Sequence, residues 1–282
     1  MTTDELPRPS RPSTPSALLG DLRDVWVSID DLLASLDDED LAAPTACPGW
    51  DVAAVLAHVI GTELMMAGEA PPAVDVPDLP HLRNEIARAN EAWILARRDR
   101  TPDELRAEFR EVVARRTEEL GGLTQSEVDA ESWTPAGQAT LGRFLQIRVF
   151  DTWIHELDIR DAVGRVGHET GPAVQRTLAE VGNGIGFVVG KRAGAPEGSW
   201  VRIDLPGPEP ARFDVVVEGR ARVVEDEPSG DPTVTVTLGS TDLVRCIAGR
   251  VDPAALLAAG TITLGGDVAL GERIVSAFPY TI

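Results

Sequence analysis

The sequence predicts a two-domain α+β protein, with an antiparallel helical bundle in the first half and an α+β domain in the second. Two observations indicate this division. Apolar residues recur at helical spacing through most of residues 17–164, whereas period-two alternation appears after about residue 168, most clearly in TVTVTL at 233–238. The chain has 282 residues, of which 43% are apolar, and this is enough for a core in each half. We expect a leader at 1–16, the bundle at 17–167 and the α+β domain at 168–282.

The first half contains the helices that would form the bundle. A helical pattern over 17–36 is followed by the loop APTACPGWD, in which Asp51 is a good N-cap for a helix over 52–68. A proline-rich connector at 70–80 leads to helical sequence over 81–123, which we expect to break near Thr101 and Pro102. A loop around 133–137 precedes the last helix of the bundle, which ends at Gly164.

The second half mixes helices and strands. The expected strands cover 200–205, 212–219, 233–238 and 261–266, and the expected helices cover 172–192, 240–250, 252–260 and 267–278. Because the strands do not alternate regularly with helices, the pattern is typical of an α+β domain with an antiparallel or mixed sheet.

Charge and composition exclude several classes of function. Subtracting 46 acidic from 26 basic residues gives a net charge of −20, so the surface would repel a phosphate backbone and nucleic acid is not an expected partner. No apolar run approaches the roughly 20 residues that span a bilayer. Residues 1–16 are rich in Pro, Ser and Thr and carry no signal-type apolar stretch. We therefore expect a disordered leader, a cytoplasmic location and no membrane partner.

The stretch FDTWIHELDIR, residues 150–160, places Asp151, His155 and Asp158 at positions i, i+4 and i+7 of a helix. These positions lie on one face, so two carboxylates and an imidazole are expected to point together into the bundle. A satisfied polar network is the more common explanation for such a set, and pairing of Asp158 with Arg160 or Arg165 is another. This helix alone leaves these alternatives open.

His58 favours a ligand site. It stands in the middle of the apolar helix over 52–68, where a lone histidine is usually a hydrogen-bonded core residue. One imidazole from one helix, with a carboxylate and an imidazole at i and i+4 of another, is nevertheless a ligand set that metal sites in helical bundles use. Three protein ligands would leave a coordination position open for a water or a thiol.

Three neighbouring residues are weaker candidates. Cys47 has no Cys or His at metal-binding spacing beside it and is expected to be a small buried loop residue, reduced like the distant Cys246. Trp50 is expected to pack onto the following helix as a hydrophobic staple. Glu63, five residues after His58, is expected to lie too far round the helix to share its face closely.

The loop and helix CPGWDVAAVLAHV, followed some ninety residues later by RVFDTWIHELDIR, resembles the mycothiol-dependent maleylpyruvate isomerase family of actinobacteria. The resemblance covers nearly the whole chain after the leader. It implies a DinB-like four-helix bundle for the first half. For the second half, including the ending GDVALGERIVSAF, it implies a sterol-carrier-protein-like α+β domain.

The resemblance also implies a zinc site and a thiol cofactor, mycothiol. The family's zinc ligands, a His from the second helix and a Glu and a His four residues apart on a later helix, fall on His58, Asp151 and His155. The shorter Asp151 in place of Glu is a departure, which implies a tighter site, another divalent metal, or reliance on Asp158 or a water. The family's active-site arginine from the C-terminal domain is carried over to Arg273.

Our leading hypothesis is a metal-dependent enzyme of thiol chemistry that acts on a small-molecule substrate as a mycothiol-dependent isomerase or transferase. Asp158 would orient a ligand imidazole, and Arg148 and Arg273 are candidate cations for substrate carboxylates. The alternative is a non-catalytic regulatory protein that binds a metal or small ligand. A third interpretation is a lipid binder that uses the C-terminal half, although an ordinary core explains that half equally well.

Overall fold

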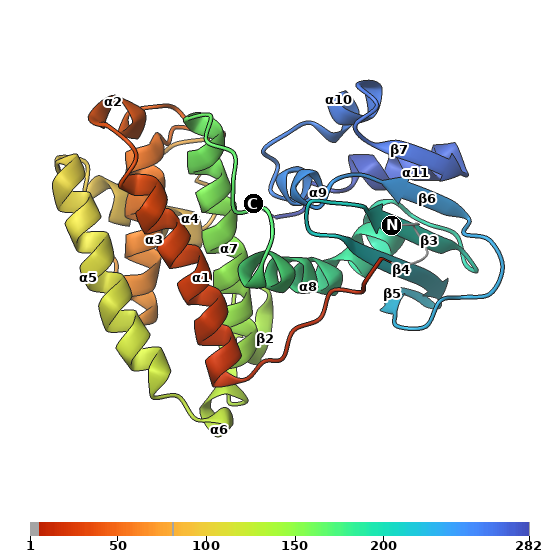
Figure 1. Cartoon of the computed structure of the whole chain (residues 1–282), viewed down its shortest axis with the longest axis horizontal. Helices are drawn as coiled ribbons and strands as arrows, with labels where there is room; N and C mark the ends of the chain where they lie inside the picture. Colours follow the sequence, from red (N-terminus) through yellow and green to blue (C-terminus); the bar gives the residue numbers. More distant parts are fainter. Residues whose placement is uncertain (1–5, 81, 282) are drawn as a thin grey trace. The chain divides into compact units, whose positions relative to one another are not determined.

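The computed structural model describes residues 6–80 and 82–281, which form two compact units (Figure 1). The first unit is Ser13–Gly167, and the second runs from His168 onward and includes the N-terminal segment up to Pro12. The first unit is helical and the second contains a sheet with helices, so the two-domain α+β fold class expected from the sequence is confirmed. No helix within the described ranges is long and apolar enough to cross a membrane.

Four long helices form the bundle, and a fifth packs beside them. The helices that enclose the core are α1 (Pro15–Leu33), α3 (Val52–Met66), α5 (Pro102–Gly121) and α7 (Leu141–Ala162), while α4 (Glu85–Leu95) packs on α3. Two short helices, α2 (Asp38–Leu41) and α6 (Gln125–Val128), lie in the connections. As expected, Asp51 caps α3, with its carboxylate accepting from the amide of Ala54, and the break at Thr101 is the capped start of α5.

Helix α7 carries Asp151, His155 and Asp158 and is buried on nearly all sides. Its interior positions include Trp153 and Leu157, but also charged side chains such as Arg148, His155 and Asp158. Charged groups are seldom fully buried unless they are paired, so this helix must supply partners for them within the bundle.

The loop expected around 133–137 is a short hairpin. Strand β1 (Glu131–Thr134) pairs antiparallel with β2 (Gly137–Thr140), and Gly137 has a φ of 101° at the turn. That left-handed backbone suits glycine because it has no Cβ. The strands are short and largely exposed, so they carry little of the apolar alternation that would have indicated them.

The second unit is built on a five-stranded mixed sheet in the order β5-β4-β3-β6-β7. Its strands are β3 (Trp200–Leu205), β4 (Ala211–Glu218), β5 (Arg220–Val224), β6 (Val234–Thr237) and β7 (Thr263–Gly266). Only the β3–β6 pair of this sheet is parallel. The helical elements are α8 (Pro172–Phe187), the π-helix η2 (Val188–Arg192), α9 (Ser240–Ile247), α10 (Pro253–Ala258) and α11 (Val268–Ser276).

Strand β5 was not expected from the sequence. It follows β4 after a tight turn at Gly219, whose φ is 67°, and all five of its residues are exposed or half-buried. An edge strand of this kind has no buried face with a clear period-two pattern.

The structure also differs from the expectation of a disordered leader over 1–16. Residues 1–5 lie outside the described residues, but Leu6 is buried, the amide of Arg212 donates to the carbonyl of Pro7 at 2.8 Å, and Arg8 pairs with Asp214 at 2.6 Å. Helix α1 already begins at Pro15. The leader is ordered by partners some two hundred residues away, which its own composition could not indicate.

Candidate metal centre

Two helices of the bundle bring the expected ligands together. His58 lies in the middle of α3, and Asp151 and His155 lie one turn apart on α7. One ligand atom from each of the three lies within 4.8 Å of the others. The packing of α3 against α7 thus assembles a set that is separated by more than ninety residues in the sequence.

The two imidazoles and the carboxylate face one another closely. Nε2 of His58 lies 3.4 Å from Oδ2 of Asp151, and Nε2 of His155 lies 3.8 Å from Oδ1 of the same carboxylate. The rings of His58 and His155 meet edge to face, with centroids 4.5 Å apart. Both imidazoles are buried, whereas the Asp151 side chain is 34% exposed, so the group can be reached from solvent on the carboxylate side.

The surroundings give these three residues different charge states. Burial, together with the positive charge of His155, lowers the pKa of His58 to about 4, so this imidazole is neutral at pH 7. Burial alone would lower the pKa of His155 as well, but the hydrogen bond with Asp158 and the negative charges of Asp151 and Asp158 outweigh it and raise the pKa to about 10. Burial opposes the charge of Asp151, but Arg148 and His58 hold the pKa of that carboxyl well below its usual range.

An ion-pair chain continues from Asp151 into the core of the bundle. Arg148 donates to Oδ2 of Asp151 at 2.5 Å, to Oε1 of Glu63 at 3.2 Å and to the hydroxyl of Thr152 at 3.1 Å. Glu63 also accepts from Arg116 of α5 at 3.2 Å. Arg148 is therefore buried and neutralised, which contradicts its expected role as a cation for substrate carboxylates. Glu63, which the sequence analysis did not assign to the site, holds Arg148 in place.

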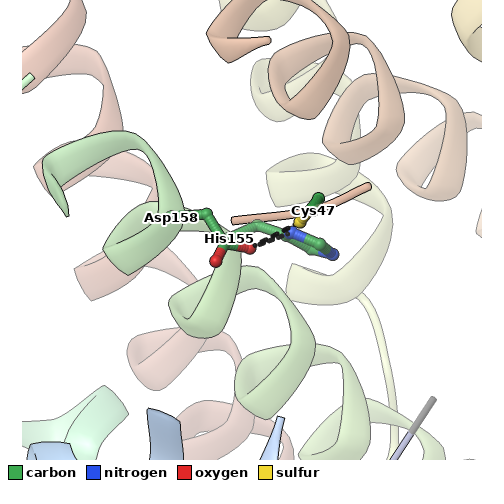
Figure 2. A group of neighbouring side chains, drawn as sticks. All are labelled: Cys47, His155 and Asp158. Carbon is green, nitrogen blue, oxygen red and sulfur yellow. Dashed lines mark hydrogen bonds and ion pairs between the residues drawn. The ribbon is translucent and has the colours of Figure 1, made fainter. Parts of the chain in front are cut away.

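A second group, Cys47, His155 and Asp158, is built around the Nδ1 atom of the His155 ring (Figure 2). Oδ2 of Asp158 lies 2.9 Å from Nδ1 of His155 and 3.1 Å from Sγ of Cys47. Asp158 thus contacts the ring nitrogen that does not face Asp151, a position from which a carboxylate can orient a ligand imidazole. Cys47 comes from the loop before α3, and its partner is 111 residues away, so no local spacing could have identified it.

Trp50 covers the two imidazoles instead of serving only as an apolar staple. Its ring centroid lies 5.2 Å from that of His58 and 6.0 Å from that of His155. The indole Nε1 donates to Oε2 of Glu91 on α4 at 3.2 Å. This hydrogen bond fixes an aromatic wall beside the candidate ligands, a feature that the short CPGW motif did not reveal.

The donor set fits a divalent metal. Nε2 of His58, the nitrogen that faces Asp151, meets that carboxylate only at 3.4 Å. Hydrogen bonds between buried polar groups are normally shorter, so this long contact leaves Nε2 available as a metal ligand. Two imidazoles and one carboxylate are also a donor set typical of catalytic zinc.

Two overlapping groups of three possible ligands share His155, and they are not equivalent. In the group of Cys47, His155 and Asp158 all members are buried, and the Nδ1 atom is already hydrogen-bonded to Asp158. In the group of His58, Asp151 and His155 the Nε2 atoms converge on a partly exposed carboxylate. The second group is therefore the better candidate for the metal.

Arg273, the expected active-site arginine, lies on α11 in the other unit. Its Nε donates to the carbonyl of Ala193 at 3.1 Å and its Nη1 to that of Ala269 at 3.2 Å. The side chain is exposed, and no carboxylate within residues 6–80 and 82–281 pairs with it. It has the character of a cation that an acidic ligand could use.

Comparison with known proteins identifies relatives over most of the chain. A family model described as the mycothiol maleylpyruvate isomerase N-terminal domain matches residues 22–160, and the model of the MDMPI C-terminal domain matches residues 178–273. Two uncharacterized proteins of Mycobacterium tuberculosis, from strains CDC 1551 / Oshkosh and ATCC 25618 / H37Rv, are each 29% identical over 185 residues. These alignments cover 60% of this chain and 64% of each relative, slightly under two thirds of their length.

Solved structures share the fold over nearly the full length. The crystal structure of the mycothiol-dependent maleylpyruvate isomerase matches with a TM-score of 0.55 at 20% identity, covering 94% of this chain and 95% of that chain. A histidine-to-alanine mutant of that isomerase matches with a TM-score of 0.53 at the same identity and coverage. At this level of identity the similarity establishes the shared architecture.

Proposed function

This chain belongs to the mycothiol maleylpyruvate isomerase family, and from this premise we propose that it is a divalent-metal enzyme of thiol chemistry. The metal is zinc, held by His58, Asp151 and His155, and the cofactor is a low-molecular-weight thiol of the mycothiol type. The reaction is a thiol-dependent isomerisation, or transfer of the thiol, on a small electrophilic substrate.

One observation carries the proposal. Ligand atoms of two imidazoles and one carboxylate lie within 4.8 Å of one another, and the carboxylate side chain is 34% exposed. Three protein donors leave a fourth coordination position, and the exposed side provides access to it. Closed structural zinc sites usually have four protein ligands, whereas three with an open position are typical of catalysis.

The protein supplies orientation and charge control. Asp158 binds Nδ1 of His155 and thereby directs Nε2 toward Asp151, while Arg148 donates to Oδ2 of Asp151 and holds that carboxylate beside both imidazoles. When bound, the metal would favour the thiolate form of the thiol, whose addition to an electrophilic double bond, rotation about the resulting single bond and elimination would convert a cis into a trans isomer.

Trp50 and Arg273 are assigned supporting roles. Trp50 packs against both imidazoles and would restrict water on that side of the group. Arg273 has no carboxylate partner among the described residues, so its guanidinium is available to an acidic ligand, as the family resemblance implies for the active-site arginine.

The first test is the metal content of protein purified without a histidine tag. We expect near-stoichiometric zinc in the wild type, and its loss in His58→Ala and His155→Ala with the fold retained by circular dichroism. His168→Asn is the matched control, because this histidine lies in the other unit at a φ of 52°, which asparagine tolerates.

The second test addresses catalysis. Zinc-loaded protein should convert maleylpyruvate to its trans isomer, or consume a related electrophile, only when mycothiol is present. In cobalt-substituted protein the thiol should change the visible spectrum, because it enters the coordination sphere. A metal that remains bound in a closed site, with no spectral response to thiol and no turnover, would contradict the enzyme and favour a regulatory metal-binding protein.

A further inference from the structure

Cys47 lies in a tightly constrained loop directly before α3. Its amide donates to Oγ1 of Thr45 at 3.1 Å, its carbonyl accepts from the amide of Trp50 at 3.1 Å, and Pro44 and Asp51 form an antiparallel bridge across the base of the loop. The backbone therefore holds the thiol in a fixed place. Its Sγ points toward α7, where it meets Asp158 at 3.1 Å (Figure 2).

Cys47 and His155 share one acceptor atom. The contact at 3.1 Å from Sγ and the contact at 2.9 Å from Nδ1 both end on Oδ2 of Asp158. Because an ionised carboxylate only accepts, the thiol and the ring N–H are the donors. All three residues are buried, with exposed fractions of 6% or less, so water does not replace either donor easily.

The direction of these bonds determines which nitrogen of His155 is available. With Nδ1 committed to Asp158, Nε2 is the nitrogen that faces Asp151 and His58. If the carboxylate of Asp158 turned away, the imidazole of His155 would lose this hydrogen bond and could rotate about its side-chain torsions. The thiol provides a second anchor for the carboxylate from a different segment of the chain, and such outer partners fix the orientation of ligand imidazoles.

We propose that Cys47 is a positioning residue of the metal centre, which holds Asp158 in the orientation that presents Nε2 of His155 to the metal. This inference rests on the proposed function, in which His58, Asp151 and His155 bind the metal. The same loop carries Trp50 against both imidazoles, so it contributes an orienting thiol and an aromatic wall together. Loss of the thiol should therefore weaken metal binding without removing a ligand.

The experiment compares side chains that keep or remove the donor. Cys47→Ser retains an O–H donor, whereas Cys47→Ala and Cys47→Val lack one and bracket the thiol in volume. Cys246→Ala, which removes a buried thiol of the other unit, is the matched control. Zinc affinity is measured by competition with a chromophoric chelator, the coordination geometry by the visible spectrum after cobalt substitution, and folding by circular dichroism.

We expect Cys47→Ala and Cys47→Val to bind zinc about 10-fold or more weakly, at the lower end of the effects of lost outer partners. Cys47→Ser should recover most of the affinity, and Cys246→Ala should match the wild type. If one of the apolar variants does not fold, the other still provides the comparison, because both remove the same donor.

Failure of this inference is distinct from failure of the proposed function. A wild type that takes up no zinc would remove the proposed metal enzyme. A wild type that binds zinc, with Cys47→Ala and Cys47→Val binding equally well and with unchanged cobalt spectra, would refute the positioning role alone. Equal losses in Cys47→Ser and Cys47→Ala would refute it too, as would a thiolate-to-cobalt charge-transfer band that requires Cys47, because the thiol would then be a ligand.

Discussion

Glu63 is the residue whose replacement tests the buried charge network most directly. Its side chain is 2% exposed, and its two oxygens accept from Arg148 of α7 at 3.2 Å and from Arg116 of α5 at 3.2 Å. One carboxylate therefore joins three helices of the bundle. The substitution Glu63→Gln keeps the shape of the side chain but removes the negative charge that faces two buried guanidinium groups.

The expected loss of stability is large because the arginines remain. Removing one partner of a buried ion pair costs about 3–5 kcal/mol when an uncompensated charge is left in the interior. Arg148 keeps Asp151 and Arg116 keeps Glu119, so each arginine loses one of two acidic partners and we take the lower end, about 3 kcal/mol. For a unit of roughly 150 residues, 1 kcal/mol shifts the melting temperature by about 2–4 °C. We therefore expect Glu63→Gln to lower the melting temperature of the bundle by about 6–12 °C.

Tryptophan fluorescence during thermal unfolding is the suitable assay. Five of the six tryptophans lie in the bundle, namely Trp26, Trp50, Trp93, Trp133 and Trp153, and Trp200 lies in the other unit. The signal therefore reports mainly on the unit that contains Glu63.

The control for this prediction is Glu119→Gln. Glu119 also pairs with Arg116, at 2.6 Å, but its side chain is 37% exposed, so its loss should cost no more than about 1 kcal/mol. If Glu63→Gln is no less stable than Glu119→Gln, the argument that the buried network requires this charge is refuted.

Two further predictions concern packing and high pH. Gly61→Ala should destabilise the bundle by about 1–3 kcal/mol, because the added Cβ would lie 2.4 Å from Cβ of Trp93. The control Gly20→Ala meets nothing within 4 Å and should be neutral or stabilising. Equal melting temperatures of the two variants would contradict this prediction. Burial, with the charge of Asp242, raises the pKa of Cys246 to about 12, so as pH rises from about 9 toward 12 the unfolded chain releases a proton that the folded chain keeps. The free energy of unfolding should fall over this range by up to about 1.4 kcal/mol per pH unit, and in Cys246→Ala it should fall less steeply, as measured by urea titrations at each pH. Parallel pH dependences of the wild type and the variant would exclude the effect.

Much of the candidate site followed from the sequence because it lies on regular elements. The spacing of Asp151, His155 and Asp158 fixed their common direction once a helix was assigned, and the structure brings the first two beside His58 as the family resemblance implied. The partners of Glu63 and Cys47 did not follow, because they lie on other helices 53 to 111 residues away. Helical periodicity reports which side of a helix is buried, but not which residue of another helix meets it.

The fold, like the site, has parts that the sequence predicted and parts that it did not. Long helices and strands with a buried face were predicted, while the hairpin at 131–140 and the edge strand β5 were missed because exposed short strands lack an apolar alternation. The leader was misjudged for a different reason. Its Pro- and Ser-rich composition suggests disorder, yet the Arg8 side chain donates hydrogen bonds to the buried Asp214 and to the carbonyl of Val224 on the sheet. Such long-range pairing overrides a local compositional preference.

Asp151 stands where the family resemblance places a glutamate. The sequence left open a tighter site, another divalent metal, or reliance on Asp158 or a water, and the surroundings of Asp151 bear on the role of Asp158. Asp158 cannot easily compensate as a ligand, because its Oδ2 accepts from His155 and Cys47 on the far side of the imidazole ring. Arg148 draws Oδ2 of Asp151 toward the core and leaves Oδ1 nearer to His155. Asp151 would hold a metal together with His58 of α3 and His155 of α7. The remaining coordination space would then fall to an external ligand, which is the role that the proposed thiol requires.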